Sequence, residues 1–281
     1  QSRMKFLSIL SILLFLSTLS FSKVKKEKDI AYATNGPANL LDIYHQKNIK
    51  TPQDVILFIH GGSWNSGKKN TYWFLGRAFA RKEKVAVIIN YPLSPDAKYR
   101  EMATDCAKAV VWVKQNIAKY GGNPDRIFVM GHSAGGHLAA LIDADQSYFN
   151  KLGQSNPIKG VILNDPFGLD IQQYLELQIN TGDKHVPGFL KVFTTDPEEW
   201  KKASPFNKIA NITNPYLMYV GEKTFESIKL QTPAFNKEML KQGKQASLTV
   251  IKGKKHIGMI TQMIFGCNKL YDEIIGFTDS N

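Results

Sequence analysis

Short apolar runs alternate with longer amphipathic segments from about residue 54 onward. The continuous apolar runs have the length and character of strands buried inside a parallel sheet, and they occupy 55–59, 85–89, 127–130, 161–163, 216–220 and 248–251. The earlier segment 39–45 alternates apolar and polar residues, which predicts an antiparallel strand. The alternation of strands with helical segments predicts an α/β fold with a mostly parallel central sheet flanked by helices.

Amphipathic helices are predicted between these strands. From Tyr99 to Tyr120 apolar residues recur at three- and four-residue spacing, and Gly121 provides a stop signal. Segments 233–243 and 267–277 are predicted as further helices. The span of about 166–214 breaks the rhythm with aromatic residues and prolines, and we interpret it as an insertion after the sixth strand of the fold. An insertion at that place can form a lid or one wall of a pocket.

The first 22 residues have the pattern of a secretory signal. Residues 1–3 precede Met4 and are interpreted as not native, and an almost uninterrupted apolar run covers residues 6–19. Ser20 and Ser22 provide the small residues that a signal peptidase requires, which predicts cleavage after Ser22. An uncleaved anchoring helix is the alternative, although the run is short for a membrane span. We therefore expect a secreted or periplasmic protein without stable membrane insertion after cleavage.

The composition is that of a folded globular protein. The 281 residues are 43% hydrophobic and 21% charged, which excludes disordered, collagen-like and multi-span membrane classes. Residues 23–281 are the size of one α/β domain. The formal net charge is +12, but 31 of the 36 basic residues are lysines, and reading of nucleic-acid bases favours arginine. We expect a solvated basic surface and no nucleic-acid partner; attraction to anionic polymers or lipids is the alternative.

The cysteines and histidines give no sign of a disulfide framework or a metal centre. Cys106 and Cys267 each lie in an apolar stretch that is predicted to be helical, so both are expected to be small buried hydrophobes without a bridge. No pair of histidines has the spacing of a zinc site. We expect neither a metal nor a cofactor.

The first chemical motif is Gly131-His132-Ser133-Ala134-Gly135, which directly follows the apolar run 127–130 and precedes a helix of small residues. A tight turn from strand to helix holds its central serine in a strained backbone conformation, and the flanking glycines leave room for it. The motif predicts Ser133 as a nucleophile. An ordinary turn with an idle serine is the alternative.

The second motif is His60-Gly61-Gly62-Ser63-Trp64, directly after the run 55–59. Acyl transfer builds negative charge on a carbonyl oxygen, and a glycine-rich loop can bring backbone N–H groups close to that oxygen. The N–H of Ala134, next to the predicted nucleophile, would be their partner. We therefore predict an oxyanion hole from Gly62, Ser63 and Ala134.

Together these motifs resemble the alpha/beta-hydrolase superfamily, in particular its exported carboxylesterases and its feruloyl-esterase-like and kynurenine-formamidase-like branch. The resemblance runs from about residue 54 to residue 260 and includes Tyr91-Pro-Leu-Ser-Pro95, Trp112 and Tyr120-Gly-Gly-Asn-Pro124. It departs at Ser63, where many relatives carry glycine or alanine, but a backbone donor survives that change. The resemblance implies a serine hydrolase without metal or cofactor.

The resemblance implies a general base in the loop after the last strand. Lys254-Lys255-His256 follows the run 248–251, so His256 is the candidate. Of the other histidines, His60 is expected to brace its loop, and His132 and His137 lie too close to the nucleophile along the chain to act as its base.

The orienting carboxylate is the weakest point of the resemblance. Relatives place it about three residues after a glycine that ends the preceding strand, and Thr224 stands there in this chain. Glu222 and Glu226 lie close enough to substitute. Some hydrolases of this fold use the end of the strand before that, where Asp165 lies in the crevice that such sites occupy. We favour Asp165 as the acid, with Glu222 and Glu226 as alternatives. The non-functional alternative for Asp165 is that it is an ordinary turn residue ahead of Pro166.

These residues predict a carboxylic ester hydrolase that works through an acyl-enzyme. The resemblance implies a small-molecule or polysaccharide-linked ester as substrate, such as acetyl or feruloyl esters of polysaccharide. The alternative enzymatic hypothesis is an arylformamidase-like amide hydrolase. A third hypothesis is not enzymatic: the chain is a catalytically silent hydrolase fold that serves as a binding protein. This hypothesis rests on Thr224, which stands at the expected position of the acid.

Overall fold

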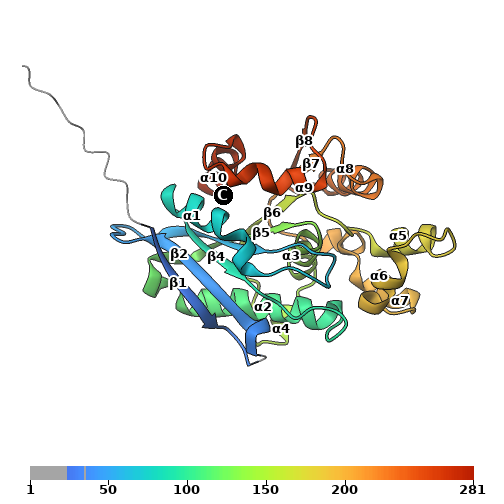
Figure 1. The fold of residues 1–281 in the computed structure, drawn as a ribbon, viewed down its shortest axis with the longest axis horizontal. Helices are drawn as coiled ribbons and strands as arrows, with labels where there is room; N and C mark the ends of the chain where they lie inside the picture. Colours follow the sequence, from blue (N-terminus) through green and yellow to red (C-terminus); the bar gives the residue numbers. More distant parts are fainter. Residues whose placement is uncertain (1–23, 35) are drawn as a thin grey trace, which may run out of the picture.

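An eight-stranded sheet forms the centre of the protein in a computed structural model that describes residues 24–34 and 36–281 (Figure 1). The strand order is β1-β2-β4-β3-β5-β6-β7-β8. β2 pairs antiparallel with β1 and with β4, and every other pair is parallel. The strands are β1 (Val24–Ala31), β2 (Leu40–Gln46), β3 (Gln53–Ile59), β4 (Val85–Ile89), β5 (Gly122–His132), β6 (Ile158–Asn164), β7 (Tyr216–Gly221) and β8 (Ala246–Ile251).

Helices cover both faces of the sheet (Figure 1). The α-helices are α1 (Trp73–Arg81), α2 (Tyr99–Asn116), α3 (Ala134–Ala144), α4 (Ser147–Asn150), α5 (Ile171–Gln178), α6 (Val186–Phe193), α7 (Pro197–Ala203), α8 (Glu226–Lys241), α9 (His256–Thr261) and α10 (Lys269–Ser280). The 3₁₀ helices are η1 (Gly36–Asn39), η2 (Lys69–Tyr72), η3 (Ile117–Tyr120), η4 (Pro205–Asn211) and η5 (Gln262–Ile264).

The alternation of side chains along β3 separates two hydrophobic layers. Val55 and Leu57 pack in the layer that contains α2 and α3, whereas Ile56 and Phe58 pack in the layer that contains α1 and α10. Successive side chains of a strand point to opposite faces, so a continuous apolar run fills both layers at once. This is why the runs 55–59, 85–89 and 127–130 inside these strands contain no polar residue.

The predicted α/β fold, with a mostly parallel sheet flanked by helices, is confirmed. The antiparallel strand expected at 39–45 is β2. The insertion expected at about 166–214 follows β6 and contains α5, α6, α7 and η4. Its helices lie together at one end of the sheet, beside the carboxyl ends of the central strands (Figure 1).

The two edge strands differ from the expectation. β1 was not predicted, because its sequence VKKEKDIA carries charges that protect an edge strand and hide its pattern. β8 was expected to be a buried central strand, but it is the opposite edge of the sheet, and Val250 is 57% exposed. An apolar run shows that a segment is a strand without showing how many neighbours the strand has.

Two helix predictions also need correction. The helix expected at 233–243 begins at Glu226, with Pro233 inside it, because Ile228 and Phe235 are buried on one face and hold both halves together. The helix expected from residue 267 begins at Lys269. Cys267 therefore lies before the helix and is exposed, whereas Cys106 is buried as expected; both thiols are free.

The predicted signal segment, residues 1–22, its cleavage site after Ser22 and the new amino terminus at Lys23 all lie outside the described residues. Among residues 24–34 and 36–281, no helix is long and apolar enough to cross a membrane.

Candidate active site

Ser133 lies in the turn between β5 and α3. Its backbone dihedrals are φ 54° and ψ −124°, a combination that a serine rarely adopts. A Cβ atom on Gly131 would stand 2.2 Å from the carbonyl oxygen of Gly135, and one on Gly135 would stand 2.1 Å from that of Ile59. Both glycines are therefore needed for the backbone of the turn to pass so closely.

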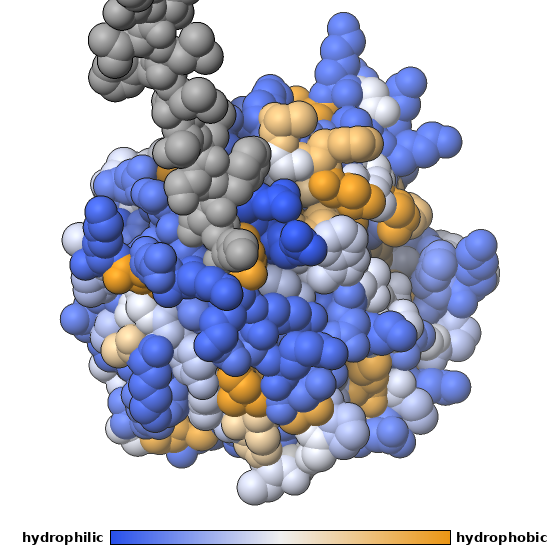
Figure 2. Space-filling model, turned by 60° about the vertical axis from the view of Figure 1, so that its left-hand side comes forward, coloured by the Kyte–Doolittle hydropathy of each residue, from blue (hydrophilic) through white to orange (hydrophobic). Residues whose placement is uncertain are grey.

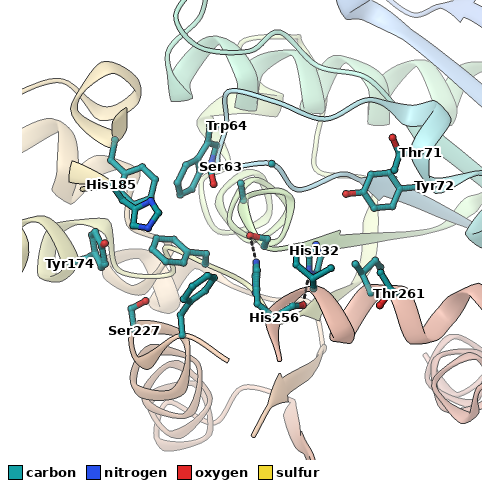
Figure 3. Close-up of a pocket in the computed structure, with 18 of the residues that line it drawn as sticks. Ser63, Trp64, Thr71, Tyr72, His132, Tyr174, His185, Ser227, His256 and Thr261 are labelled. Carbon is teal, nitrogen blue, oxygen red and sulfur yellow. Dashed lines mark hydrogen bonds between the residues drawn. The ribbon is translucent and has the colours of Figure 1, made fainter. Parts of the chain in front are cut away.

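His256 is the first residue of α9, just after the loop that follows β8. Its Nε2 lies 2.8 Å from Ser133 Oγ, and its Nδ1 lies 2.6 Å from Asp165 Oδ2. The first of these contacts is the dashed line between the two side chains in Figure 3. The imidazole thus connects a hydroxyl and a carboxylate through its two ring nitrogens.

Asp165 directly follows β6 and is completely buried. Its φ of 52° turns the chain sharply at the strand end. The N–H of Gly221 donates to Oδ1 at 2.8 Å, and the hydroxyl of Thr224 donates to Oδ2, the same oxygen that faces His256. Hydrogen bonds on both oxygens fix the carboxylate in one orientation toward the imidazole.

The two alternative acids lie elsewhere. The carboxylate of Glu222 accepts the N–H of Gly253 at 2.7 Å, and the carboxylate of Glu226 pairs with Lys229. Thr224 was noted in the sequence only as a departure from the relatives. Its role as a donor to Asp165 was missed, because a contact between two strand ends is not visible along the chain.

The three residues of the predicted oxyanion hole line the same cavity as Ser133. Gly62 has φ 125° and Ser63 has φ 50°, so the loop after β3 is sharply turned. The N–H groups of Gly62, Ser63 and Ala134 donate to no protein acceptor anywhere in the described part of the chain. Unpaired amides beside a nucleophile are suited to bind a developing negative charge.

The side chains of the other motif histidines support the site, and among the described residues none of them forms a hydrogen bond with Ser133. His60 stacks on Tyr91 and binds the carbonyl of Gly61 through Nδ1 at 2.8 Å, so it braces the loop as expected. His132 stacks on His256, with ring centroids 4.9 Å apart. Burial lowers the pKa of His132 to about 3, so its ring is neutral near pH 7 and adds no positive charge beside His256.

A cavity of about 690 Å³ opens over Ser133 and His256. One side includes Tyr174 and His185 from the insertion, which thereby forms a wall of the pocket; the other side includes Tyr72 and Thr261 (Figure 3). The lining residues that share apolar aromatic character are Trp64, Trp73, Phe74, Phe167, Phe189 and Phe225. Among the described residues, no group of three or more His, Cys, Asp or Glu side chains could hold a metal ion.

This fold and this arrangement of serine, histidine and carboxylate define an alpha/beta-hydrolase of the esterase-like kind. The chain belongs to the BD-FAE family, which matches residues 41–237.

Among proteins of similar sequence is the isoprenylcysteine alpha-carbonyl methylesterase ICME of Arabidopsis thaliana, which is 26% identical over 273 residues, covering 91% of this chain and 62% of that protein. The esterase LipC of Mycobacterium tuberculosis is 28% identical over 207 residues, covering 66% of this chain and 48% of that protein. The chain thus spans about half to two thirds of the length of these relatives.

Two solved structures share the fold. A truncated carbohydrate esterase from gut microbiota superposes with a TM-score of 0.79 at 20% identity, over 93% of this chain and 97% of that one. Esterase B from Lactobacillus rhamnosis gives a TM-score of 0.78 at 19% identity, over 92% of this chain and 85% of that one. At such low identity the similarity establishes the fold.

Proposed function

We propose that the protein is a serine carboxylic ester hydrolase. The observation that carries this proposal is the continuous chain of hydrogen bonds from Ser133 through His256 to Asp165, next to three unpaired amides in an open cavity. The relatives named as esterases support the same class of reaction. A silent binding fold is disfavoured, because the serine and the imidazole are within hydrogen-bonding distance.

In the proposed mechanism, Ser133 Oγ attacks the ester carbonyl carbon while His256 Nε2 takes the hydroxyl proton. Asp165 holds Nδ1–H and stabilises the imidazolium that forms. The amides of Gly62, Ser63 and Ala134 bind the oxyanion of the tetrahedral intermediate. His256 then returns the proton to the leaving alcohol, which leaves an acyl group on Ser133. A water molecule activated by His256 hydrolyses that acyl-enzyme in the same way.

We further propose that the cavity takes a bulky or aromatic acyl group, such as a feruloyl group, in preference to an acetyl group alone. The support is the aromatic wall of Phe167, Phe189 and Trp64, whose rings pack edge-on or tilted at centroid distances of 5.3 to 6.0 Å. Aromatic rings prefer such arrangements, so a planar ring can add to this cluster. An acyl series from acetyl to feruloyl on one alcohol tests this preference through kcat/KM.

The decisive test of the reaction class is Ser133→Ala. We expect hydrolysis of short p-nitrophenyl esters to fall by at least about four orders of magnitude, while the far-UV circular dichroism and the unfolding temperature stay close to those of the wild type. A fluorophosphonate probe should label Ser133 in the wild type and leave the variant unlabelled. Ser147→Ala, at an exposed serine on α4, is the matched control. Unchanged turnover in Ser133→Ala would remove the proposal.

Export through residues 1–22 is also proposed, from the signal pattern of the sequence. Protein recovered outside the cytoplasm should begin at Lys23. Exported protein that still carries Met4 would contradict cleavage.

A further inference from the structure

Exposed apolar side chains gather around the mouth of the cavity. Trp73, Phe225, Ile257 and Ile264 line the cavity and are also 50%, 49%, 63% and 51% exposed. Leu177, beside the lining residue Gln178, is 64% exposed, and Phe265, beside Ile264, is 70% exposed. We call these six residues the apolar rim: Trp73, Leu177, Phe225, Ile257, Ile264 and Phe265.

The apolar rim is assembled from separate parts of the chain. Trp73 begins α1, Leu177 lies in α5, Phe225 precedes α8, and Ile257 and Ile264 lie in α9 and η5. Figure 2 shows a mainly hydrophilic face with a group of apolar side chains toward its upper right and smaller apolar spots elsewhere. Large exposed apolar side chains that surround one opening mark an interaction surface rather than scattered surface residues.

Positive charge lies directly beside the apolar rim. The loop before His256 and the loop after β7 are adjacent, since the N–H of Lys223 donates to the carbonyl of Lys254 at 2.8 Å. These two loops carry four lysines, Lys223, Lys252, Lys254 and Lys255, and none of their ammonium groups forms an ion pair within the described residues. Glu222 is the one carboxylate in these loops. The cluster therefore has an excess of positive charge.

The chemistry of the apolar rim distinguishes between possible occupants. A sugar chain would be bound by aromatic faces together with many hydrogen-bonding groups, whereas half of the rim is isoleucine and leucine. Branched aliphatic side chains flanked by unpaired lysines match a partner with an apolar interior and negative charges at its surface. A layer of anionic lipid has both properties.

We propose that the apolar rim and the adjacent lysines dock this protein on anionic lipid surfaces. The rim side chains enter the boundary between headgroups and acyl chains, and the lysines contact the anionic headgroups. The mouth of the cavity then faces the lipid layer, so an amphiphilic ester reaches Ser133 without crossing water. Docking of this kind needs no membrane-spanning helix, and it does not depend on the proposed hydrolysis.

Vesicle sedimentation tests this inference in the Ser133→Ala background, which prevents hydrolysis of the lipid. The protein used in this test starts at Lys23, because the apolar run at 6–19 would bind lipid by itself. This truncation leaves the described sheet and helices intact, since they begin at Val24. Vesicles contain phosphatidylcholine with about one quarter phosphatidylserine, or phosphatidylcholine alone. We expect binding to the anionic vesicles that exceeds binding to neutral vesicles by about tenfold and that weakens as salt is added.

Two sets of variants separate the apolar contribution from the charged one. Ile257→Ser/Ile264→Ser and Lys252→Gln/Lys255→Gln should each weaken binding to anionic vesicles by about tenfold or more. Leu240→Ser, at a 52% exposed leucine near the end of α8, is the matched control and should bind like the parent. Unfolding temperatures verify that every variant is folded.

Several results would overturn the proposal. One is equal sedimentation of the Ile257→Ser/Ile264→Ser variant and its parent, and another is equal binding to neutral and anionic vesicles. Self-association that the rim variants abolish, without any binding to vesicles, would assign the rim to a second copy of the chain. Retention on a polysaccharide column that requires Trp73 and Phe225, without binding to vesicles, would assign it to a sugar.

Discussion

The ends of β6 and β7 lie next to each other in the sheet, yet they contribute to the site in different ways. β6 ends at Asp165, a buried carboxylate that contacts His256. β7 ends in the loop where the resemblance to alpha/beta-hydrolases leads one to expect the acid, and Thr224 stands there instead. The hydroxyl of Thr224 and the N–H of Gly221 both donate to Asp165.

This difference suggests a rule for the proposed orienting acid: its position in the sheet is free to vary as long as the carboxylate reaches the imidazole. Parallel strands end at the same edge of the sheet, so adjacent strand ends offer nearly equivalent positions to one histidine. With the carboxylate on β6, the loop after β7 becomes a source of hydrogen-bond donors. The two strand ends together therefore hold the carboxylate against His256.

The largest effect is expected from Asp165→Asn. The amide keeps the shape of the carboxylate but removes the charge and presents a donor where His256 needs an acceptor, so the wrong tautomer of the imidazole is favoured. We expect kcat for a p-nitrophenyl ester to fall by up to about four orders of magnitude, with little change in KM. A fall of less than tenfold would show that Asp165 is a turn residue.

The second prediction moves the acid back to β7. Because the side chains of Thr224 and His256 meet at the same oxygen of Asp165, an aspartate at position 224 is close enough to reach the imidazole. The double variant Asp165→Asn/Thr224→Asp should recover about a hundredfold in kcat over Asp165→Asn. Thr224→Asp alone should be impaired, since two carboxylates would then repel each other. If the double variant is no faster than Asp165→Asn, the two strand ends are not interchangeable.

The third prediction concerns the donor itself. Thr224→Val keeps the shape of the side chain but removes its hydroxyl, so that within the described part of the chain the imidazole is the one partner left to Oδ2 of Asp165. A hydrogen bond to a charged group contributes about 1.5–3 kcal/mol, so kcat should fall by about ten- to a hundredfold. Thr224→Ser should restore most of the lost activity. Equal activity of the valine and serine variants would mean that the hydroxyl does not position Asp165.

The smallest effects are expected at Glu222 and Glu226. Their carboxylates are engaged with Gly253 and Lys229, so Glu222→Gln and Glu226→Gln should each keep kcat within about twofold of the wild type. Steady-state kinetics on the same ester measure both. A thousandfold loss in either variant would return the acid to the loop after β7.

The sequence supports prediction where local chemistry determines structure. The apolar runs identify the central strands because burial on both faces excludes polar residues, and Gly131 and Gly135 identify the turn of Ser133 because only glycine fits there. The end of β6 also identifies Asp165 as a candidate, since strand ends converge at one edge of the sheet.

Contacts between distant segments could not be predicted in this way. The donation from Thr224 to Asp165 joins residues 59 positions apart, and no periodicity or motif encodes it. The charged segment β1 forms a strand because it pairs with β2, and its own sequence has no hydrophobic pattern that predicts a strand. The apolar residues around Cys267 predicted that it lies on the buried face of a helix. The helix starts two residues later, and Cys267 is exposed.

The positive φ of Ser133 has a consequence for the stability of the whole fold. A non-glycine residue held in such a conformation costs about 1–3 kcal/mol, which the packing of the core must offset in every folded molecule. Ser133→Ala and Ser133→Gly both lack the hydroxyl, but only glycine relieves the strain. The glycine variant should therefore unfold at a temperature several degrees above that of the alanine variant. If Ser133 is the nucleophile that we propose, its activity comes at the expense of thermal stability.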